Sequence, residues 1–151
     1  MVRRGFDKED FARNHPGGEL GKQLALKVEN IMHPISDVAQ INNTDSISSC
    51  AKKMTDNPLG AALLLENGSL KGIVTEGDLR KSIASNLDLS NSIEPFINDN
   101  PISIHSSVSI LDAMKIMEDR SSKISCLPVI DSDGKCLGLL TIHDLYQTKL
   151  V

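Results

Sequence analysis

The chain has 151 residues with 16 Lys and Arg against 20 Asp and Glu, a formal net charge of −4 and 3% aromatic residues. This length permits one medium domain or two small modules with a real core, while the acidic balance and scarce aromatic rings exclude nucleic acid as a partner. Three cysteines with no C-x-x-C spacing predict reduced core thiols, and the lack of a long apolar run or signal peptide predicts a soluble, cytoplasmic chain with no membrane partner.

Residues 1–27 precede any repeated pattern. The stretch from Asp7 to Arg13 predicts one short helix, and Pro16-Gly17-Gly18 breaks the chain after it. His15 stands at this break, where a histidine is most often a loop residue. The next apolar residues recur at helical spacing and predict a second amphipathic helix. They are Leu20, Leu24, Val28, Ile31 and Met32.

Two further stretches share one predicted order of strand, helix, strand, strand and helix. Short extended pieces are expected around Ile41 and over residues 102–104, with Thr44-Asp45 and Ser106-Ser107 capping the helices that follow. Both helices are predicted from apolar residues spaced three and four apart, which mark a buried stripe. These residues are Ile47, Cys50, Ala51 and Met54 within 46–54, and Ile110, Ala113, Met114 and Met117 within 109–117.

A β-hairpin is predicted after each of these helices. Residues 61–65 and 126–130 are apolar runs that suit strands. Asn67-Gly68 and Asp133-Gly134 follow them and supply the turns, because such dipeptides between apolar runs are typical of hairpins.

The end of each hairpin carries nearly the same eight residues, Gly-Ile-Val-Thr-Glu-Gly-Asp-Leu at 72–79 and Gly-Leu-Leu-Thr-Ile-His-Asp-Leu at 138–145. Such internal similarity indicates duplicated units. In each copy a Thr precedes an Asp by three residues where a helix is expected to begin, so the simplest interpretation of this T-x-x-D motif is a helix cap. The repetition of the flanking pattern leaves a ligand-binding role open beside it.

The element order and its T-x-x-D ending resemble the CBS domain, a module found in tandem pairs. The resemblance covers residues 28–84 as repeat 1 and 92–148 as repeat 2. It implies an α+β fold in which the two repeats pack through their sheets into a pseudo-twofold disc with one cleft for each repeat. Nucleotide-like ligands bind in these clefts in that family. CBS pairs also commonly associate face to face, which implies a homodimer.

Carried over by position, the resemblance assigns Thr75 and Asp78 to one cleft and Thr141 and Asp144 to the other. The family's Asp accepts hydrogen bonds from ribose hydroxyls, and its Thr meets phosphate. The chemistry is sound in itself, since a carboxylate accepts two bonds from a diol and the start of a helix favours an anion. Arg80 follows the first motif by two residues, where it either meets a charged phosphate or remains a solvated cation.

The histidines of the repeats give no further site. His143 lies inside the second motif where the first copy has Gly77, and a solvent-facing side chain is favoured there over a ligand contact. His33 and His105 have no metal-ligand spacing, so no metal site is predicted.

Residues 5–21 carry a second resemblance, through Gly5-Phe6, Asp10-Phe11-Ala12 and His15-Pro16-Gly17-Gly18. This run resembles the carboxyl-terminal part of the KpsF/GutQ-type sugar-phosphate isomerases. These arabinose 5-phosphate isomerases interconvert ribulose 5-phosphate and arabinose 5-phosphate on the route to the lipopolysaccharide sugar Kdo. They place an SIS domain, an α/β sugar-isomerase fold, before this run and the CBS pair. Residues 1–27 then correspond to the tail of a missing SIS domain and a linker helix, and we expect the chain to be a fragment.

The second resemblance also implies roles for the parts. His15 matches the family's proposed active-site histidine, and an imidazole that titrates near neutrality suits the proton transfers of aldose–ketose isomerisation. The chain alone is expected to be inactive, because the SIS domain would build most of the catalytic centre.

The function implied by both resemblances is regulatory. The module requires no cofactor and binds a nucleotide or nucleotide-sugar, with CMP-Kdo, AMP and ATP as candidates. The full-length enzyme is expected to be a tetramer. The alternative is a purely structural dimerisation module with empty clefts.

Overall fold

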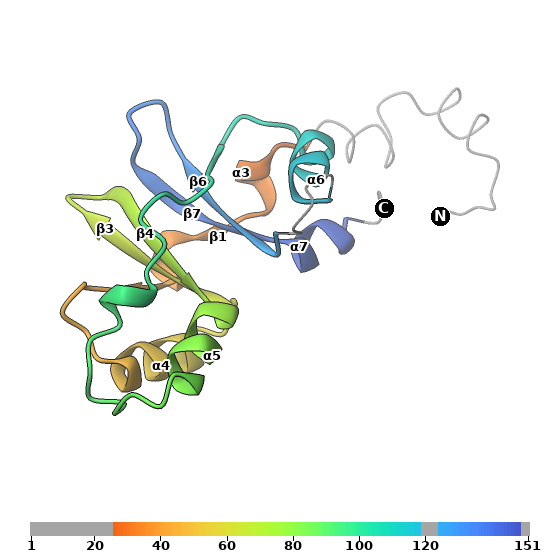
Figure 1. Cartoon of the computed structure of the whole chain (residues 1–151). Coiled ribbons are helices and arrows are strands. Elements are labelled where there is room, and N and C mark those ends of the chain that lie inside the picture. Colours follow the sequence, from red (N-terminus) through yellow and green to blue (C-terminus); the bar gives the residue numbers. More distant parts are fainter. Residues whose placement is uncertain (1–25, 119–123, 149–151) are drawn as a thin grey trace, which may run out of the picture.

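The computed structural model describes residues 26–118 and 124–148, and it contains the predicted α+β unit twice (Figure 1). The predicted helix from Asp7 to Arg13, together with His15, Leu20 and Leu24, lies outside the described residues. The first unit consists of β2 (Ala39–Ile41), α4 (Ile47–Asp56), β3 (Ala61–Glu66), β4 (Ser69–Thr75) and α5 (Glu76–Ala84). The second consists of β5 (Ile104–His105), α6 (Ile110–Glu118), β6 (Cys126–Ile130), β7 (Cys136–Thr141) and α7 (Ile142–Tyr146). The shorter elements are α3 (Val28–Ile31), β1 (His33–Pro34) and the 3-10 helices η1 (Ile35–Asp37) and η2 (Glu94–Phe96).

Each unit builds one sheet around its hairpin. The orders are β2-β3-β4 in the first sheet and β1-β7-β6-β5 in the second. The first strand of each unit runs parallel to the second, and the hairpin strands are antiparallel. Asn67 and Gly68 have φ values of 52° and 83°, and Gly134 has a φ of 85°. Because these positive values suit Asn and Gly, the predicted hairpin turns are confirmed.

The chain that leads into each unit crosses onto the other unit. We call residues 26–34 and 91–99 the lead-in segments. The first contains β1, which pairs with β7 of the second unit, and the N–H of Val28 donates to Val108 O at 2.8 Å. The second pairs with β4 of the first unit, since Asn98 and Ile73 exchange backbone hydrogen bonds of 2.9 and 3.0 Å. Each unit is therefore completed by the lead-in segment of the other unit.

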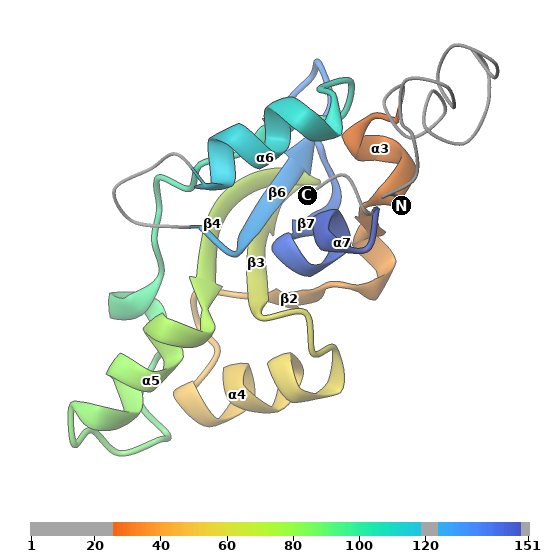
Figure 2. The same ribbon diagram turned by 90° about the vertical axis from the view of Figure 1, so that its right-hand side faces the viewer.

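The elements form layers, with both sheets in the middle of the molecule. Figure 2 shows α4 and α5 at one end and α3, α6 and α7 at the other. Each unit has its own core beneath its helices, and a third core lies between the two sheets. The buried residues of this third core are Val38, Ala61, Leu63, Ile73, Cys126, Cys136 and Leu139.

The cysteines are part of these cores. Cys50, Cys126 and Cys136 are buried and unpaired, in agreement with the expectation of core thiols. Burial raises the pKa of all three thiols, that of Cys50 to about 11. Within residues 26–118 and 124–148, no helix is long and apolar enough to cross a bilayer.

The predicted caps of α4 and α6 are wrong by one to three residues. Ser46 Oγ accepts from the N–H of Ser49 at 2.9 Å, and Ser109 Oγ accepts from the N–H of Asp112 at 3.1 Å. Several hydroxyl and carboxyl side chains precede each helix, and the cap is the one directly before the first helical residue. Asp45 instead accepts from Lys53 Nζ and from the N–H of Asn42, both at 2.8 Å.

Candidate ligand clefts

The T-x-x-D motifs are capping boxes at the starts of α5 and α7. The N–H of Thr75 donates to Asp78 Oδ2 at 3.0 Å, and the N–H of Asp78 donates to Thr75 Oγ1 at 3.4 Å. The second motif repeats this arrangement at 2.9 Å between Thr141 N and Asp144 Oδ2 and 3.1 Å in return. The capping interpretation is confirmed, because each motif satisfies backbone donors at a helix start.

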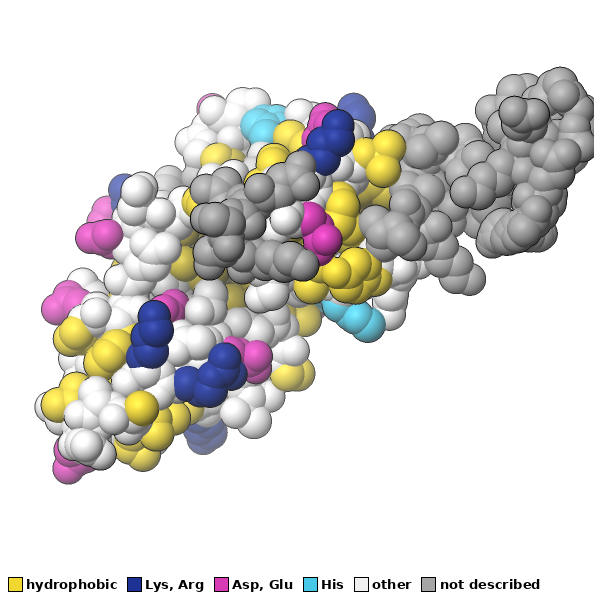
Figure 3. All heavy atoms as spheres, turned by 45° about the vertical axis from the view of Figure 1, so that its right-hand side comes forward, with side chains coloured by type: hydrophobic (Ala, Val, Ile, Leu, Met, Phe, Trp, Pro, Cys, Tyr) yellow, Lys and Arg dark blue, Asp and Glu magenta, His cyan; other side chains and the backbone are white. Residues whose placement is uncertain are grey.

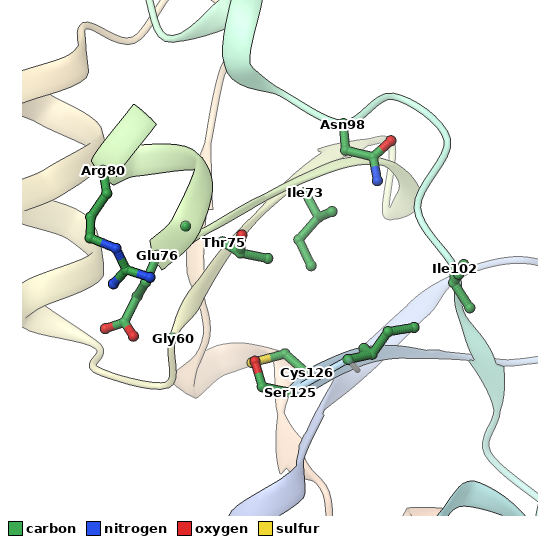
Figure 4. Close-up of a pocket in the computed structure, with 11 residues that line it drawn as sticks. Gly60, Ile73, Thr75, Glu76, Arg80, Asn98, Ile102, Ser125 and Cys126 are labelled. Atoms are coloured by element: carbon green, nitrogen blue, oxygen red, sulfur yellow. The ribbon is translucent and has the colours of Figure 1, made fainter. Parts of the chain in front are cut away.

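A pocket of about 390 Å³ opens beside the first motif, between the two units. Its walls come from four separate parts of the chain, which Figure 4 shows around the space. These are the end of β4 with the start of α5, the residue before β3, the chain before β5, and the start of β6. The lining residues are Gly60, Ile73, Thr75, Glu76, Gly77, Arg80, Asn98, Ile102, Ile124, Ser125 and Cys126.

The predicted residues Thr75 and Arg80 line this pocket, whereas Asp78 does not. The Asp78 carboxylate turns back to Thr75, and its Oδ2 accepts from both the N–H and the Oγ–H at 3.0 Å. Its Oδ1 accepts no hydrogen bond from the described part of the chain. One acceptor of Asp78 is thus left for a partner.

The polar end of the pocket suits an anion. Arg80 is exposed, and its Nη2 lies 4.0 Å from the position of a Cβ built on Gly77, so the guanidinium folds back over the first turn of α5. Arg80 makes no ion pair with any described residue. A guanidinium without an ion pair beside a helix start can receive a phosphate or a carboxylate. The carboxylate of Glu76 lines the same end of the pocket, and the Thr75 hydroxyl keeps its hydrogen bond to Asp78.

Three isoleucines give the pocket an apolar part, beside the polar Asn98 and Ser125. Ile73, Ile102 and Ile124 face the space between the units, and an apolar wall opposite a few polar groups is typical of small-molecule sites. Sequence reasoning missed Asn98, Ile102 and the start of β6. No local pattern indicates that the chain before β5 lies against β4.

The pocket's cysteine is not poised for nucleophilic chemistry. Burial, the largest effect, raises the pKa of the Cys126 thiol, a hydrogen bond with Ser125 opposes this, and the carboxylates of Glu76 and Asp144 raise the pKa again. The neutral thiol is the weaker nucleophile, so Cys126 serves as an apolar part of the wall.

The second motif is surrounded differently. The Nε2–H of His33 in β1 donates to Asp144 Oδ1 at 2.9 Å, while Oδ2 accepts from Thr141. Thr141 is buried. Tyr146, which corresponds to Arg80, is exposed and donates to Glu118 at 3.2 Å. The second motif therefore lacks the cation found at that place beside the first.

The histidine inside the second motif faces solvent. His143 is exposed, and its ring contacts the amide of Gln147 at 2.9 Å, as expected for a solvent-facing residue. No group of three metal-ligating side chains occurs within residues 26–118 and 124–148. The proposed catalytic residue His15 lies outside the described residues.

A second hollow of about 500 Å³ lies at the other end of the first sheet. It contains three carboxylates and one amine, which makes it a poor site for phosphate. Its lining residues are Asn42, Asn43, Leu64, Leu65, Glu66, Lys71, Glu94, Ile97 and Asp99.

Charges are mixed on the face shown in Figure 3, where Lys and Arg side chains lie close to Asp and Glu side chains. A nucleic-acid backbone requires a basic stripe, and this face offers none. Binding of nucleic acid was excluded from the composition, and that exclusion stays a prediction.

Two curated relatives match nearly the whole chain. The chain is 39% identical over 150 residues to arabinose 5-phosphate isomerase KdsD of Pseudomonas aeruginosa, covering 98% of this chain and 45% of that protein. It is 32% identical over 152 residues to arabinose 5-phosphate isomerase GutQ of Escherichia coli O6:H1, covering 100% of this chain and 47% of the relative. The chain thus spans about half the length of these curated relatives.

Solved structures share the fold. A CBS domain protein from Pyrobaculum aerophilum complexed with AMP superposes with a TM-score of 0.67 at 22% identity, covering 79% of this chain and 89% of that one. The CBS domain family model matches residues 28–85 and 93–149. The chain therefore belongs to the CBS domain family and contains two CBS domains in tandem.

Proposed function

We propose that the chain is the regulatory CBS pair of an arabinose 5-phosphate isomerase and that it binds a nucleotide or nucleotide-sugar in its first cleft. The observation that supports this is the pocket at the start of α5, where Thr75 and Arg80 face an apolar wall. Phosphate would meet the helix start and the guanidinium, and a base would lie against the isoleucines. AMP, ATP and CMP-Kdo are the candidates, and the AMP bound to the Pyrobaculum protein supports the adenine nucleotides.

The ribose has an acceptor in the same place. Oδ1 of Asp78 accepts no hydrogen bond from the described residues, and the residue is partly exposed. A hydroxyl that donates to it would replace water without breaking the capping box, since that box uses Oδ2. Asp78 is therefore proposed as the ribose contact although it lies behind the pocket wall.

The domain assignment is part of the proposal. Residues 1–27 are proposed as the tail of an SIS domain with a linker helix, residues 28–84 as repeat 1 and 92–148 as repeat 2. His15 would act in the isomerase centre that the SIS domain builds, and it would move a proton between ribulose 5-phosphate and arabinose 5-phosphate. The isolated chain would have no turnover. We place the full enzyme in the cytoplasm, in Kdo and lipopolysaccharide synthesis, as a tetramer.

A thermal-shift titration tests nucleotide binding. A ligand at about 100 times its Kd raises the free energy of unfolding by about 2.7 kcal/mol, so AMP, ATP or CMP-Kdo should raise Tm in a saturable way. Arg80→Ala should weaken the responding ligand about ten- to one-hundred-fold, because a charge-assisted hydrogen bond is lost. Lys81→Ala is the matched control, since this exposed neighbour does not line the pocket. Equal effects of the two variants would contradict the site.

A second candidate is a structural dimerisation module. The end of α5 and the loop after it expose Ile83, Leu87 and Leu89, which are 50%, 43% and 45% accessible. An apolar surface of this kind is typical of protein contacts. If none of the nucleotides shifts Tm and Ile83→Ser dissociates a homodimer in sedimentation velocity, dimerisation replaces nucleotide binding as the function.

A further inference from the structure

The two T-x-x-D motifs face different residues at one equivalent position of the lead-in segments. His33 is opposite Leu139 in the β1–β7 pair, and Asn98 is opposite Ile73 on β4. Leu139 and Ile73 each lie two residues before the Thr of their motif. His33 and Asn98 therefore occupy the same place, the former at the second cleft and the latter at the first.

The imidazole of His33 engages the second motif. Its Nε2–H donates to Asp144 Oδ1 at 2.9 Å, and the two side chains are 34% and 11% exposed. Since Oδ2 accepts from the N–H of Thr141, both oxygens of Asp144 are in use. This donor stands where the proposed function requires a ribose hydroxyl.

Asn98 leaves the first motif open. Its side-chain Oδ1 accepts from the N–H of Asn100 at 3.0 Å, so the amide is held by its own loop. It lines the pocket and makes no hydrogen bond with Asp78. The equivalent backbone position thus carries His33, which occupies the carboxylate of the second motif, and Asn98, which makes no hydrogen bond with the carboxylate of the first motif.

The crossing strand packs closely against the strand that leads into the second motif. Gly138 lies beneath His33, and a Cβ added there would overlap the carbonyl oxygen of His33. β1 is hydrogen-bonded to β7 at this point. The backbone therefore holds the imidazole over Asp144.

We propose that His33 is a built-in occupant of the second cleft, so that each chain binds one nucleotide, in the first cleft. His33 replaces the ribose hydroxyl as the donor to Asp144 and determines the binding stoichiometry. This inference rests on the proposed function, since it concerns how many of the two clefts are used.

Isothermal titration calorimetry with AMP tests the inference. The unmodified chain should bind one AMP, and His33→Ala should bind a second AMP about ten- to one-hundred-fold more weakly than the first, because Tyr146 stands in place of Arg80. His33→Asn introduces the residue found at the equivalent position 98, and it should also bind two AMP molecules. This variant serves as a control in case His33→Ala does not fold. In the reciprocal variant, Asn98→His, the imidazole should reach Asp78 and weaken AMP binding at least ten-fold.

The outcomes separate the two claims. Two AMP molecules on the unmodified chain, or one on both folded His33 variants, would overturn the role of His33 and leave nucleotide binding intact. No AMP bound by any variant would overturn both the inference and the AMP form of the proposed function. One site that becomes two, together with loss of affinity in Asn98→His, is the expected result.

Discussion

Asp45 ties the loop after β2 to the body of α4. Its carboxylate accepts from Lys53 Nζ and the N–H of Asn42 at 2.8 Å, and from Ser49 Oγ at 3.5 Å. Burial alone would raise its pKa, but the hydrogen bonds from Lys53, Asn42 and Ser49 outweigh burial and lower the pKa below 3.8. The folded chain therefore holds this carboxylate charged at a pH where the unfolded chain protonates it.

Asp45→Asn should make the free energy of unfolding depend less on pH in the acid range. A group with a lowered folded pKa contributes its full stability above the unfolded pKa, here 3.8, and loses it as the pH falls through the folded value. We expect a loss of about 1 kcal/mol at neutral pH, because the bonds are partly exposed, and a smaller difference between variant and parent below pH 3.8. Urea unfolding over the acid range measures both, with exposed Asp56→Asn as the control. A constant difference at every pH would disprove the assignment.

The capping of the motifs could be predicted at the residue scale, whereas the contact of His33 could not. Thr141 and Asp144 are three residues apart, so helix geometry alone brings them together. His33 and Asp144 are 111 residues apart. Their meeting depends on the path of β1, for which a two-residue strand gives almost no periodic signal.

At the scale of elements, two glycines permit the lead-in segments to cross the sheets. A Cβ on Gly72 would lie 2.6 Å from Ile97 Cγ2 and 3.2 Å from Asn98 O, and one on Gly138 would overlap His33 O. The obstacle at Gly72 includes a side chain that can turn, while the obstacle at Gly138 is backbone. The glycine that opens each repeated octapeptide is thus explained by the close approach of another strand.

Gly138→Ala should destabilise the chain by about 1–3 kcal/mol or more, because β1 must move away from β7. Gly72→Ala should cost less, since Ile97 can adjust. Gly77→Ala is the control, for its nearest neighbour would be 3.7 Å away and Ala is favoured over Gly in a helix by about 0.5–1 kcal/mol. Chemical unfolding ranks the three variants. Equal stability of Gly138→Ala and Gly77→Ala would show that the crossing is not tight.

The strands, helices and hairpin turns of both units could be predicted because each depends on short-range spacing. The spacing of apolar residues predicted α4 and α6, and the Asn67-Gly68 dipeptide predicted the first turn. The cap positions could not be chosen among several neighbouring hydroxyl groups, and the crossing of the lead-in segments has no local signal at all. The pocket wall that depends on this crossing was missed for the same reason.

At the scale of the whole molecule, the core between the sheets joins the two CBS domains into one unit. Leu63 and Leu139 are fully buried there, one from each sheet. The lead-in segments add buried residues of one repeat's chain to the other repeat's core, as with Val28 and Ile93. Because neither domain keeps its core when the other opens, unfolding should be a single cooperative transition.

Leu139→Ala tests this coupling. Removal of a buried leucine should cost about 2–5 kcal/mol, and native-state hydrogen exchange should show the same loss of protection for the slowest amides of α4 and of α6. Leu111→Ala, at a leucine that is 39% exposed, should leave both helices nearly unchanged. A loss confined to α6 would mean that the two domains unfold separately.

The crossing of the lead-in segments also bears on how the pair arose. A single repeat with its own lead-in segment could not use that segment to complete its own core, because the segment packs on the other repeat. Two identical single-repeat chains would therefore have had to exchange their lead-in segments. Duplication within one gene, with residues 85–90 as the connection between α5 and the second lead-in, turned that exchange between molecules into a contact within one chain. A short tether raises the effective concentration of each partner to the millimolar range, and it allows the two copies to carry different residues at equivalent positions, such as His33 and Asn98.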